Sequence, residues 1–381
     1  MKTYFKIFTI LLFVAFAFTG CRNPAYEIDV LLDADVIQYK ATLILKDANG
    51  AVLPNNLNVA IAGADAKSIY DFSGTKQIFA PGGVITLGVT PKDIPTASKE
   101  LNFNVIISGP NYDDKNIPVT IQLDQFSQII DVTMLKVSVP SPATTVVSQN
   151  APLVNGTTAT TTTVSTTSSS TVAETNTITI PAGTQMKDAA GAVIAGNTVA
   201  VQMVNYEAKN PETIALFPGA SLSAPNVIGE GGTAGSAFFV PAGFTSIKMF
   251  VNGTEVKQFS TPINVSVQLD PTFKPSATNA PVKVGDRLKV YSYEVATGQF
   301  KFETIGTAAI DSKGKLAINF PTNHLTIFVV GDAYVTINCV DTDVTFIAPW
   351  LNDATQPMII EVSMADGSRI IARQTIPVTN G

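Results

Sequence analysis

Hydrophobic and polar residues alternate one by one along much of this chain, which is the period of a β-strand with one buried face. Between positions 26 and 139 the alternating stretches are short and are separated by Gly, Pro, Asn and Asp. Roughly seven or eight stretches can be counted, without a helical period, which predicts an antiparallel β-sandwich. The alternation is clearest where Leu101, Phe103 and Val105 enclose Asn102 and Asn104, and where Ile117, Val119, Ile121 and Leu123 enclose Pro118, Thr120 and Gln122.

A second β-rich region extends from position 176 to 332. Its clearest strand places Ile263, Val265, Val267 and Leu269 on one face, with Asn264, Ser266 and Gln268 on the other. The tail that follows, residues 333–381, has room for three or four more strands, with a hairpin signal at Asp366-Gly367. We expect this short module to pack on its neighbour, because it is small for an independent sandwich.

A Thr/Ser-rich stretch separates the two regions. It lacks the apolar surface that a core needs, which predicts an extended linker or stalk over residues 139–175, although Thr and Val at its end also favour a strand. We therefore predict an all-β chain of tandem antiparallel β-sandwich domains joined by a Thr/Ser-rich linker. The predicted boundaries are 1–20 for a signal peptide, 21–138 for the first sandwich, 139–175 for the linker, 176–332 for the second sandwich and 333–381 for the C-terminal module.

Two stretches nearly repeat each other: KDANGAVLPNN begins at Lys46, and KDAAGAVIAGN begins at Lys187. In each, Asp and Gly enclose a tight turn, and Gly accepts the positive φ that such a turn requires. We interpret the repeat as the same hairpin turn built twice, and not as a duplicated site.

The N-terminus indicates the destination of the chain. Lys2 and Lys6 precede a short apolar run, which is typical of a secretory signal and too short to cross a bilayer as a helix. The run ends in FTGC, which resembles the bacterial lipobox, although Phe18 stands where Leu is commoner. That resemblance implies acylation of Cys21, with palmitate-type chains that anchor the mature protein to a membrane. Because Arg22 and not Asp follows Cys21, we expect the outer membrane, with the periplasmic or exposed face left open.

Charge and cysteine content exclude several classes. Charged residues make up 14% of the chain and the net charge is −6. Without a basic cluster beyond the signal, a nucleic-acid partner is not expected. The second cysteine, Cys339, has no partner for a disulfide if Cys21 is acylated, and we expect it to be a buried packing residue.

Few residues offer catalytic or metal chemistry. The chain has one histidine, so zinc motifs are absent, and we predict no cofactor, no metal and no enzymatic turnover. Asp33/Asp35 and Asp113/Asp114 could offer oxygen ligands to calcium, but they lack the spacing of a calcium loop, and we expect solvated turn residues. The glycine-rich GEGGTAGSA at positions 229–237 is predicted to be a flexible loop, and no carboxylate pair stands out for glycosidic cleavage.

Two family resemblances add to this reading. The turn at KDANGAVLP, followed by GGVITLGV and NFNVIISGPNY, resembles the immunoglobulin-like and carboxypeptidase-regulatory-like modules of bacterial surface proteins. ITIPAGT, KDAAGAV and YSYEVATGQF resemble bacterial relatives of the ZU5 domain, which is related to the GAIN domain. Together they imply a surface lipoprotein of the Bacteroidetes type.

The ZU5 resemblance also implies a possible reaction at one triplet. His324-Leu325-Thr326 resembles the self-cleavage site of GAIN-type and ZU5-type domains. There, His324 would take the proton of the Thr326 hydroxyl, which would attack the Leu325 carbonyl in a strained peptide. We expect His324 to be a packing residue, with cleavage between Leu325 and Thr326 as the alternative.

The sequence thus predicts a non-enzymatic, membrane-anchored lipoprotein that presents β-sandwich domains for structural, adhesive or ligand-binding roles at the cell envelope. Its expected partners are the membrane, through lipid on Cys21, and a protein or glycan of unknown identity. One alternative is the self-cleaving domain. The other is a glycan-binding accessory lipoprotein, which predicts an exposed aromatic patch, although a single tryptophan, Trp350, is thin support for it.

Overall fold

The computed structural model describes residues 37–335, 357–363 and 370–377, and it is almost entirely β. Cys21, Asp33, Asp35, Cys339 and Trp350 lie outside these residues, so the expectations for them stay predictions. Within the described residues, no helix has both the length and the apolar character that a membrane crossing requires.

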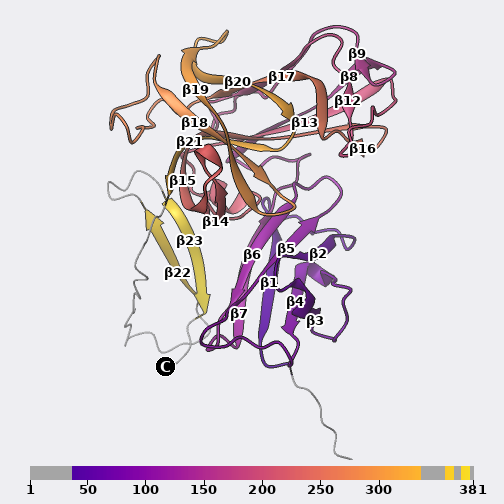
Figure 1. Cartoon of the computed structure of the whole chain (residues 1–381), viewed down its shortest axis with the longest axis vertical. Coiled ribbons are helices and arrows are strands. Elements are labelled where there is room, and N and C mark those ends of the chain that lie inside the picture. The colour runs from indigo at the N-terminus through magenta and orange to yellow at the C-terminus, as the bar shows by residue number, and fades with distance from the viewer. Residues whose placement is uncertain (1–36, 336–356, 364–369, 378–381) are drawn as a thin grey trace, which may run out of the picture. The chain divides into compact units, whose positions relative to one another are not determined.

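The first seven strands form a sandwich of two sheets, which we call the N-terminal sandwich; its strands run from indigo to purple in Figure 1. One sheet has the order β3-β4-β1-β7 and the other the order β2-β5-β6. Alternate residues of both sheets meet in one core, for example Leu43, Val105 and Ile85, as the alternation predicts. The elements are β1 (Lys40–Asp47), β2 (Asn58–Ala62), the 3₁₀ turn η1 (Ala66–Ser68), β3 (Ile69–Asp71), η2 (Pro81–Gly83), β4 (Val84–Val89), β5 (Leu101–Ser108), β6 (Lys115–Ile121) and β7 (Ser127–Met134).

One strand pair of this sandwich is parallel. β1 is antiparallel to β4 but parallel to β7, in an eight-residue register from Lys40 opposite Ser127 to Asp47 opposite Met134. Parallel neighbours need a long crossover, and the strands β2 to β6 provide it. The sandwich is therefore closed by its first and last strands.

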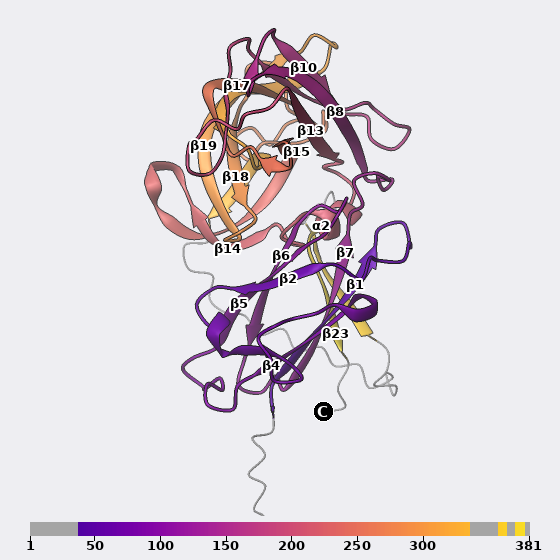
Figure 2. The same cartoon turned by 90° about the vertical axis from the view of Figure 1, so that its right-hand side faces the viewer.

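The strands β8 to β21 build a 14-stranded sheet, which we call the large sheet and which Figure 2 shows strongly curved. Its main path is β10-β11-β17-β20-β19-β18-β21-β15-β13-β8-β9, with β12, β14 and β16 paired beside it. The strands are β8 (Thr144–Val154), β9 (Thr157–Thr158), β10 (Thr162–Ser165), β11 (Asn176–Ile180), β12 (Met186–Lys187), β13 (Thr198–Tyr206), β14 (Ser223–Ile228), β15 (Ala234–Val251), β16 (Thr254–Glu255), β17 (Gln258–Gln268), β18 (Arg287–Glu294), β19 (Gln299–Ile310), β20 (Leu316–His324) and β21 (Ile327–Val335), with the short helices α2 (Glu212–Leu216) and η3 (Glu230–Gly232) between them.

Two hydrophobic cores lie against the large sheet, and the long strand β15 contributes to both. Ile247 and Met249 belong to an aliphatic core, whereas Phe239 and Phe244 belong to an aromatic one. The aromatic core also contains Leu135, which directly follows β7 of the N-terminal sandwich. Its rings stack closely, and the Phe239 and Phe300 centroids are 4.2 Å apart.

The predicted Thr/Ser-rich linker is wrong as a description of residues 139–175. β8 pairs with β13 over nine residues, and β10 pairs with β11, inside the large sheet. Ala151 and Val164 are buried in the aliphatic core. The physical reason is that Thr and Val are good strand formers, and neighbouring strands supply the apolar surface that this segment lacks.

The repeated KDxxGAV stretches do build the same turn. Gly50 and Gly191 have φ of 75° and 82°, and their N–H groups donate to the carbonyls of Asp47 and Asp188. In both turns the Asp side chain accepts a further backbone N–H four residues on. In the sequences DFSG (71–74) and DSKG (311–314), the Gly N–H likewise donates to the carbonyl of the Asp three residues earlier.

At the C-terminus, β22 (Pro357–Ser363) pairs antiparallel with β23 (Ile370–Pro377). This is the strand pairing that the hairpin signal predicts. The turn at Asp366-Gly367 lies outside the described residues.

Two glycines in turns of the large sheet distinguish the cost of backbone strain alone from the cost of strain combined with a steric clash. Gly191→Ala is expected to lower the free energy of unfolding by about 1 kcal/mol, because only its positive φ resists a side chain. Gly156→Ala is expected to cost about 3 kcal/mol, because its Cβ would also lie 2.3 Å from the Ile194 carbonyl oxygen. Urea denaturation of both variants checks this, and equal losses would contradict the turn geometry described here.

Candidate functional site

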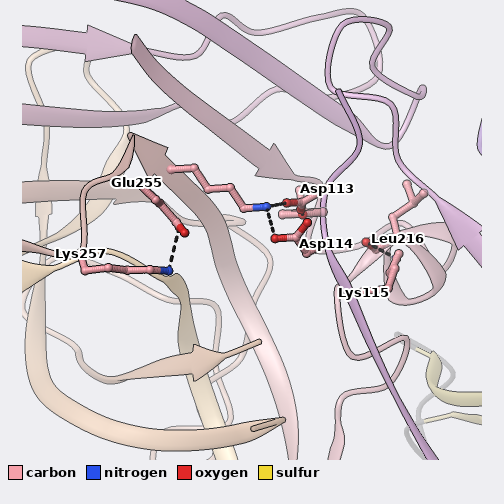
Figure 3. A network of polar contacts seen from close by, with 8 residues as sticks. Asp113, Asp114, Lys115, Leu216, Glu255 and Lys257 are labelled. Atoms are coloured by element: carbon pink, nitrogen blue, oxygen red, sulfur yellow. Dashed lines mark hydrogen bonds and ion pairs between the residues drawn. The ribbon is translucent and has the colours of Figure 1, made fainter. Parts of the chain in front are cut away.

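A group of four polar residues with partners on several elements lies where β6 begins. Asp113, Asp114, Lys115 and Asn116 connect the N-terminal sandwich to α2 and the large sheet, and we call these four residues the clasp. Figure 3 shows the first three of them. The exposed fraction is 1% for Asp113 and 0% for Lys115 and Asn116. The expectation that Asp113 is a solvated turn residue is therefore wrong: its carboxylate is enclosed by polar partners from distant strands. Asp114 stays partly exposed.

Lys115 caps the C-terminal end of α2. Its Nζ donates to the carbonyl oxygens of Ala215, Leu216 and Phe217 at 2.8, 2.7 and 3.0 Å. The end of a helix leaves such carbonyls without partners inside the helix, and they attract a cation. Three acceptors match the three N–H bonds of an ammonium group, so the protonated form is completely hydrogen bonded.

Burial acts against this protonated form. Removal from water lowers the pKa of Lys115 to about 7, while the negative charge of Asp113 acts in the opposite direction. The structure thus holds the side chain between two effects: the protein interior favours the neutral amine, and the three carbonyls favour the cation.

Asp113 is held by two residues of the large sheet. Tyr206 of β13 donates its hydroxyl to the carboxylate, and Lys248 of β15 lies 3.2 Å from it and 2.8 Å from Asp114. Burial and the nearby Asp113 charge raise the pKa of Tyr206 well above its ordinary value. Burial would lower the pKa of Lys248, but the two carboxylates outweigh it and raise the pKa, so Lys248 stays charged.

Asn116, the last residue of the clasp, donates hydrogen bonds to two backbone carbonyls. Its N–H donates to Pro218 at 2.8 Å, and its side-chain amide donates to the carbonyl of Val295. Gly298, in the same turn, has a φ of 67°, a conformation that favours glycine. The clasp therefore fixes both α2 and the turn after β18.

Sequence reasoning placed candidate chemistry at the triplet His324, Leu325 and Thr326 instead. Leu325 is buried in the aliphatic core. The His324 Nε2 lies 3.3 Å from a Glu303 oxygen, and the Thr326 hydroxyl donates to the Tyr293 carbonyl. In the described part of the chain, no hydrogen bond joins the His324 ring to the Thr326 hydroxyl. Self-cleavage stays a prediction, but the structure pairs these two side chains with other groups.

Glu303 connects His324 to Ser292. The Ser292 hydroxyl donates to the other Glu303 oxygen at 2.7 Å. Burial alone would raise the pKa of Glu303, but the hydrogen bonds from His324 and Ser292 lower it. The Glu303 carboxylate contacts both the His324 imidazole and the Ser292 hydroxyl. His324 is therefore not placed to take the proton of Ser292.

Residues 37–335 and the C-terminal strand pair contain no group of three or more His, Cys, Asp or Glu that could hold a metal ion.

A cavity beside α2, bordered by Ile214, Phe239 and Phe244, has a volume of about 10 Å³, which is room for about one water molecule. In the glycine-rich stretch, residues 229–233 form the turn between β14 and β15 and open no α-helix, whereas residues 234–237, which were also predicted to be a flexible loop, are the first residues of β15, and Ala237 is buried. The exposed phenylalanines of the described residues, Phe72, Phe79 and Phe126, lie on the N-terminal sandwich, and glycan binding stays a prediction.

Comparisons with known proteins place the chain in no family. No family model matches it, and no curated protein matches it. Among solved structures, a variant of BcpA, the major pilin subunit of Bacillus cereus, is similar with 11% identity over 82% of this chain and 96% of that chain, at a TM-score of 0.17. The Bacillus anthracis TIE protein is similar with 9% identity over 78% of this chain and 48% of that chain, at a TM-score of 0.18. Likeness at this level carries no functional argument, and the all-β class rests on the strands themselves.

Lys115→Met is expected to lower the free energy of unfolding by about 3 kcal/mol, because it removes the ammonium donor from the carbonyls of Ala215 and Leu216 at the end of α2, while the Phe217 carbonyl keeps the backbone N–H of Ala220. The matched control is Lys289→Met. It removes a cation from an exposed pair with Glu230, and it is expected to cost less than about 1 kcal/mol. Denaturant unfolding at pH 7 measures both, and similar losses would show that the buried cap is unimportant.

The same variant tests the titration of Lys115. Its pKa is about 7 when folded and about 10.4 when unfolded, so between these values the unfolded chain binds more protons and stability rises with pH. The stability loss of Lys115→Met should therefore grow from pH 7 to pH 10. Glu207, whose burial and neighbouring Glu174 raise its pKa to about 7, affects both proteins equally and cancels in the difference. A loss independent of pH would contradict the lowered pKa.

For the triplet, we expect a single unbroken chain. The purified protein, made without its signal and with Cys21 replaced, should have the same intact mass pattern as the same protein carrying His324→Ala, because Glu303 already holds the imidazole. Two fragments meeting between Leu325 and Thr326 in the parent, absent from His324→Ala, would establish self-cleavage instead.

Proposed function

We propose that this chain is a non-enzymatic, lipid-anchored protein of the cell envelope, in which the N-terminal sandwich and the large sheet act as one rigid unit with a structural or adhesive role. The observation that carries the proposal is the clasp. Charges buried between two parts of a chain are tolerated only when their partners stay fixed. If one part moved relative to the other, an ion would be left in the interior without a partner.

A rigid connection between the two parts suits a protein that holds a binding or structural surface in a fixed position. It does not suit an enzyme that works by opening and closing two domains. A hinge between two parts typically leaves their contact polar and hydrated, so that it can open. Here Lys115 and Asp113 are almost completely removed from water, and Leu135 belongs to the aromatic core of the large sheet. Such a contact suits a protein that keeps a surface at a constant distance from its attachment point.

The attachment itself rests on the sequence. The FTGC ending of the signal supports acylation of Cys21, and Arg22 supports the outer membrane. Several acyl chains on one residue give durable anchoring, because each buried methylene adds about 0.8 kcal/mol. The structural or adhesive role would then be performed from a fixed position at the membrane surface.

Cys21→Ala is expected to abolish acylation and to release the protein from the membrane fraction. Incorporation of a clickable palmitate analogue, followed by fractionation of a bacterial host, measures both effects. Cys339→Ser is the matched control, because it removes the other thiol and should keep label and membrane location. Equal labelling of the Cys21→Ala variant and the parent would contradict acylation at Cys21, and with it the proposed lipid-anchored function.

A further inference from the structure

The parallel ladder between β1 and β7 joins the two ends of the N-terminal sandwich. The Lys40 N–H donates to the Phe126 carbonyl at 3.0 Å at one end, and the Ala48 N–H donates to the Met134 carbonyl at 2.9 Å at the other. Between these hydrogen bonds the two strands stay in register over eight residue pairs. On its other side, β1 is also paired with β4.

The direction of the strands decides how tension would act on this ladder. The chain enters β1 at Lys40 and leaves β7 at Met134 toward β8. In a parallel pair, the start of one strand and the end of the other lie at opposite ends of the ladder. A force that pulls the N-terminal side of Lys40 away from the large sheet therefore slides β1 along β7, instead of peeling the strands apart.

Sliding and peeling differ strongly in the force that they require. Peeling breaks the hydrogen bonds one after another, so that each carries the whole load alone. Sliding loads the hydrogen bonds of both ladders together, and β1 must also drag Ala41, Leu43 and Leu45 out of the core, where each is at most 5% exposed. We propose that the N-terminal sandwich is a tension-bearing element whose β1–β7 ladder transmits force between the membrane attachment and the large sheet.

The residues that follow β7 are hydrogen bonded to the segment before β6, as transmission of force requires. The Leu135 carbonyl accepts the Asp113 N–H at 2.9 Å, and the Val137 N–H donates to Asn111 at 2.8 Å. Force arriving from β8 is therefore shared between β7 and the segment that carries the clasp. The biological use of the element rests on the proposed anchoring at Cys21, but the mechanical property belongs to the sandwich itself.

Single-molecule pulling in two directions tests the proposal on the chain from Arg22 onward, with Cys339→Ser. One handle is attached at the N-terminus in both proteins. The second is attached through Val139→Cys, beyond the end of β7, or through Asp124→Cys, beside the start of β1; both sites are exposed. The first geometry slides β1 along β7, and the second peels it from Lys40 onward.

We expect the rupture force at one loading rate to be at least about twofold higher through position 139 than through position 124, because forced unfolding follows the barrier that the load has to cross. Equal forces, or a higher force in the peeling geometry, would overturn the proposal. Neither protein carries lipid, so failure of acylation at Cys21 would leave this result unaffected, and the two proposals fail separately.

Discussion

The position of the N-terminal sandwich on the large sheet depends on the burial of Lys115 and Asp113. Removing an ion from water costs several kcal/mol even after the protein relaxes, and only good geometry offsets this cost. Three carbonyls surround the ammonium group of Lys115, while Tyr206 and Lys248 meet the carboxylate of Asp113. A shift of either part of the chain would leave both charges without partners.

The local structure near the clasp follows from this constraint. A helix of five residues such as α2 is not stable alone in water, because nucleation is costly and too few hydrogen bonds follow it. Lys115 supplies donors to its last carbonyls, and Phe217, directly after it, packs into the aromatic core against Phe244 and Tyr293. The helix is thus held from one side by a charge and from the other by rings.

Much of the fold could be predicted from local pattern, but the clasp could not. Alternation located β5, β6 and β17, and Asp-to-Gly spacing located the turns, because both signals depend on neighbouring residues. The partners of Asp113 and Asp114 are remote: Tyr206 lies 93 positions away from the first, and Lys248 lies 134 positions away from the second. The same limit explains the error over residues 139–175, since the apolar surface that turns them into strands comes from elsewhere in the chain. One local signal was present: a run of three charges, Asp113 to Lys115, where β6 begins, in a chain with 14% charged residues.

That scarcity of charge gives the clasp its selectivity. A surface built of Thr, Val and Asn offers many similar ways for two β-rich parts to meet, because hydrogen-bond ladders and aliphatic side chains differ little from place to place. An Asp-Asp-Lys-Asn sequence has one arrangement in which the acids meet Lys248, the lysine meets the end of α2 and the amide meets Val295. An arrangement that buries Asp113 or Lys115 away from these partners leaves polar groups without hydrogen bonds, which is costly in proportion to how completely water is excluded. The clasp therefore contributes less by adding stability than by making the alternative arrangements unfavourable.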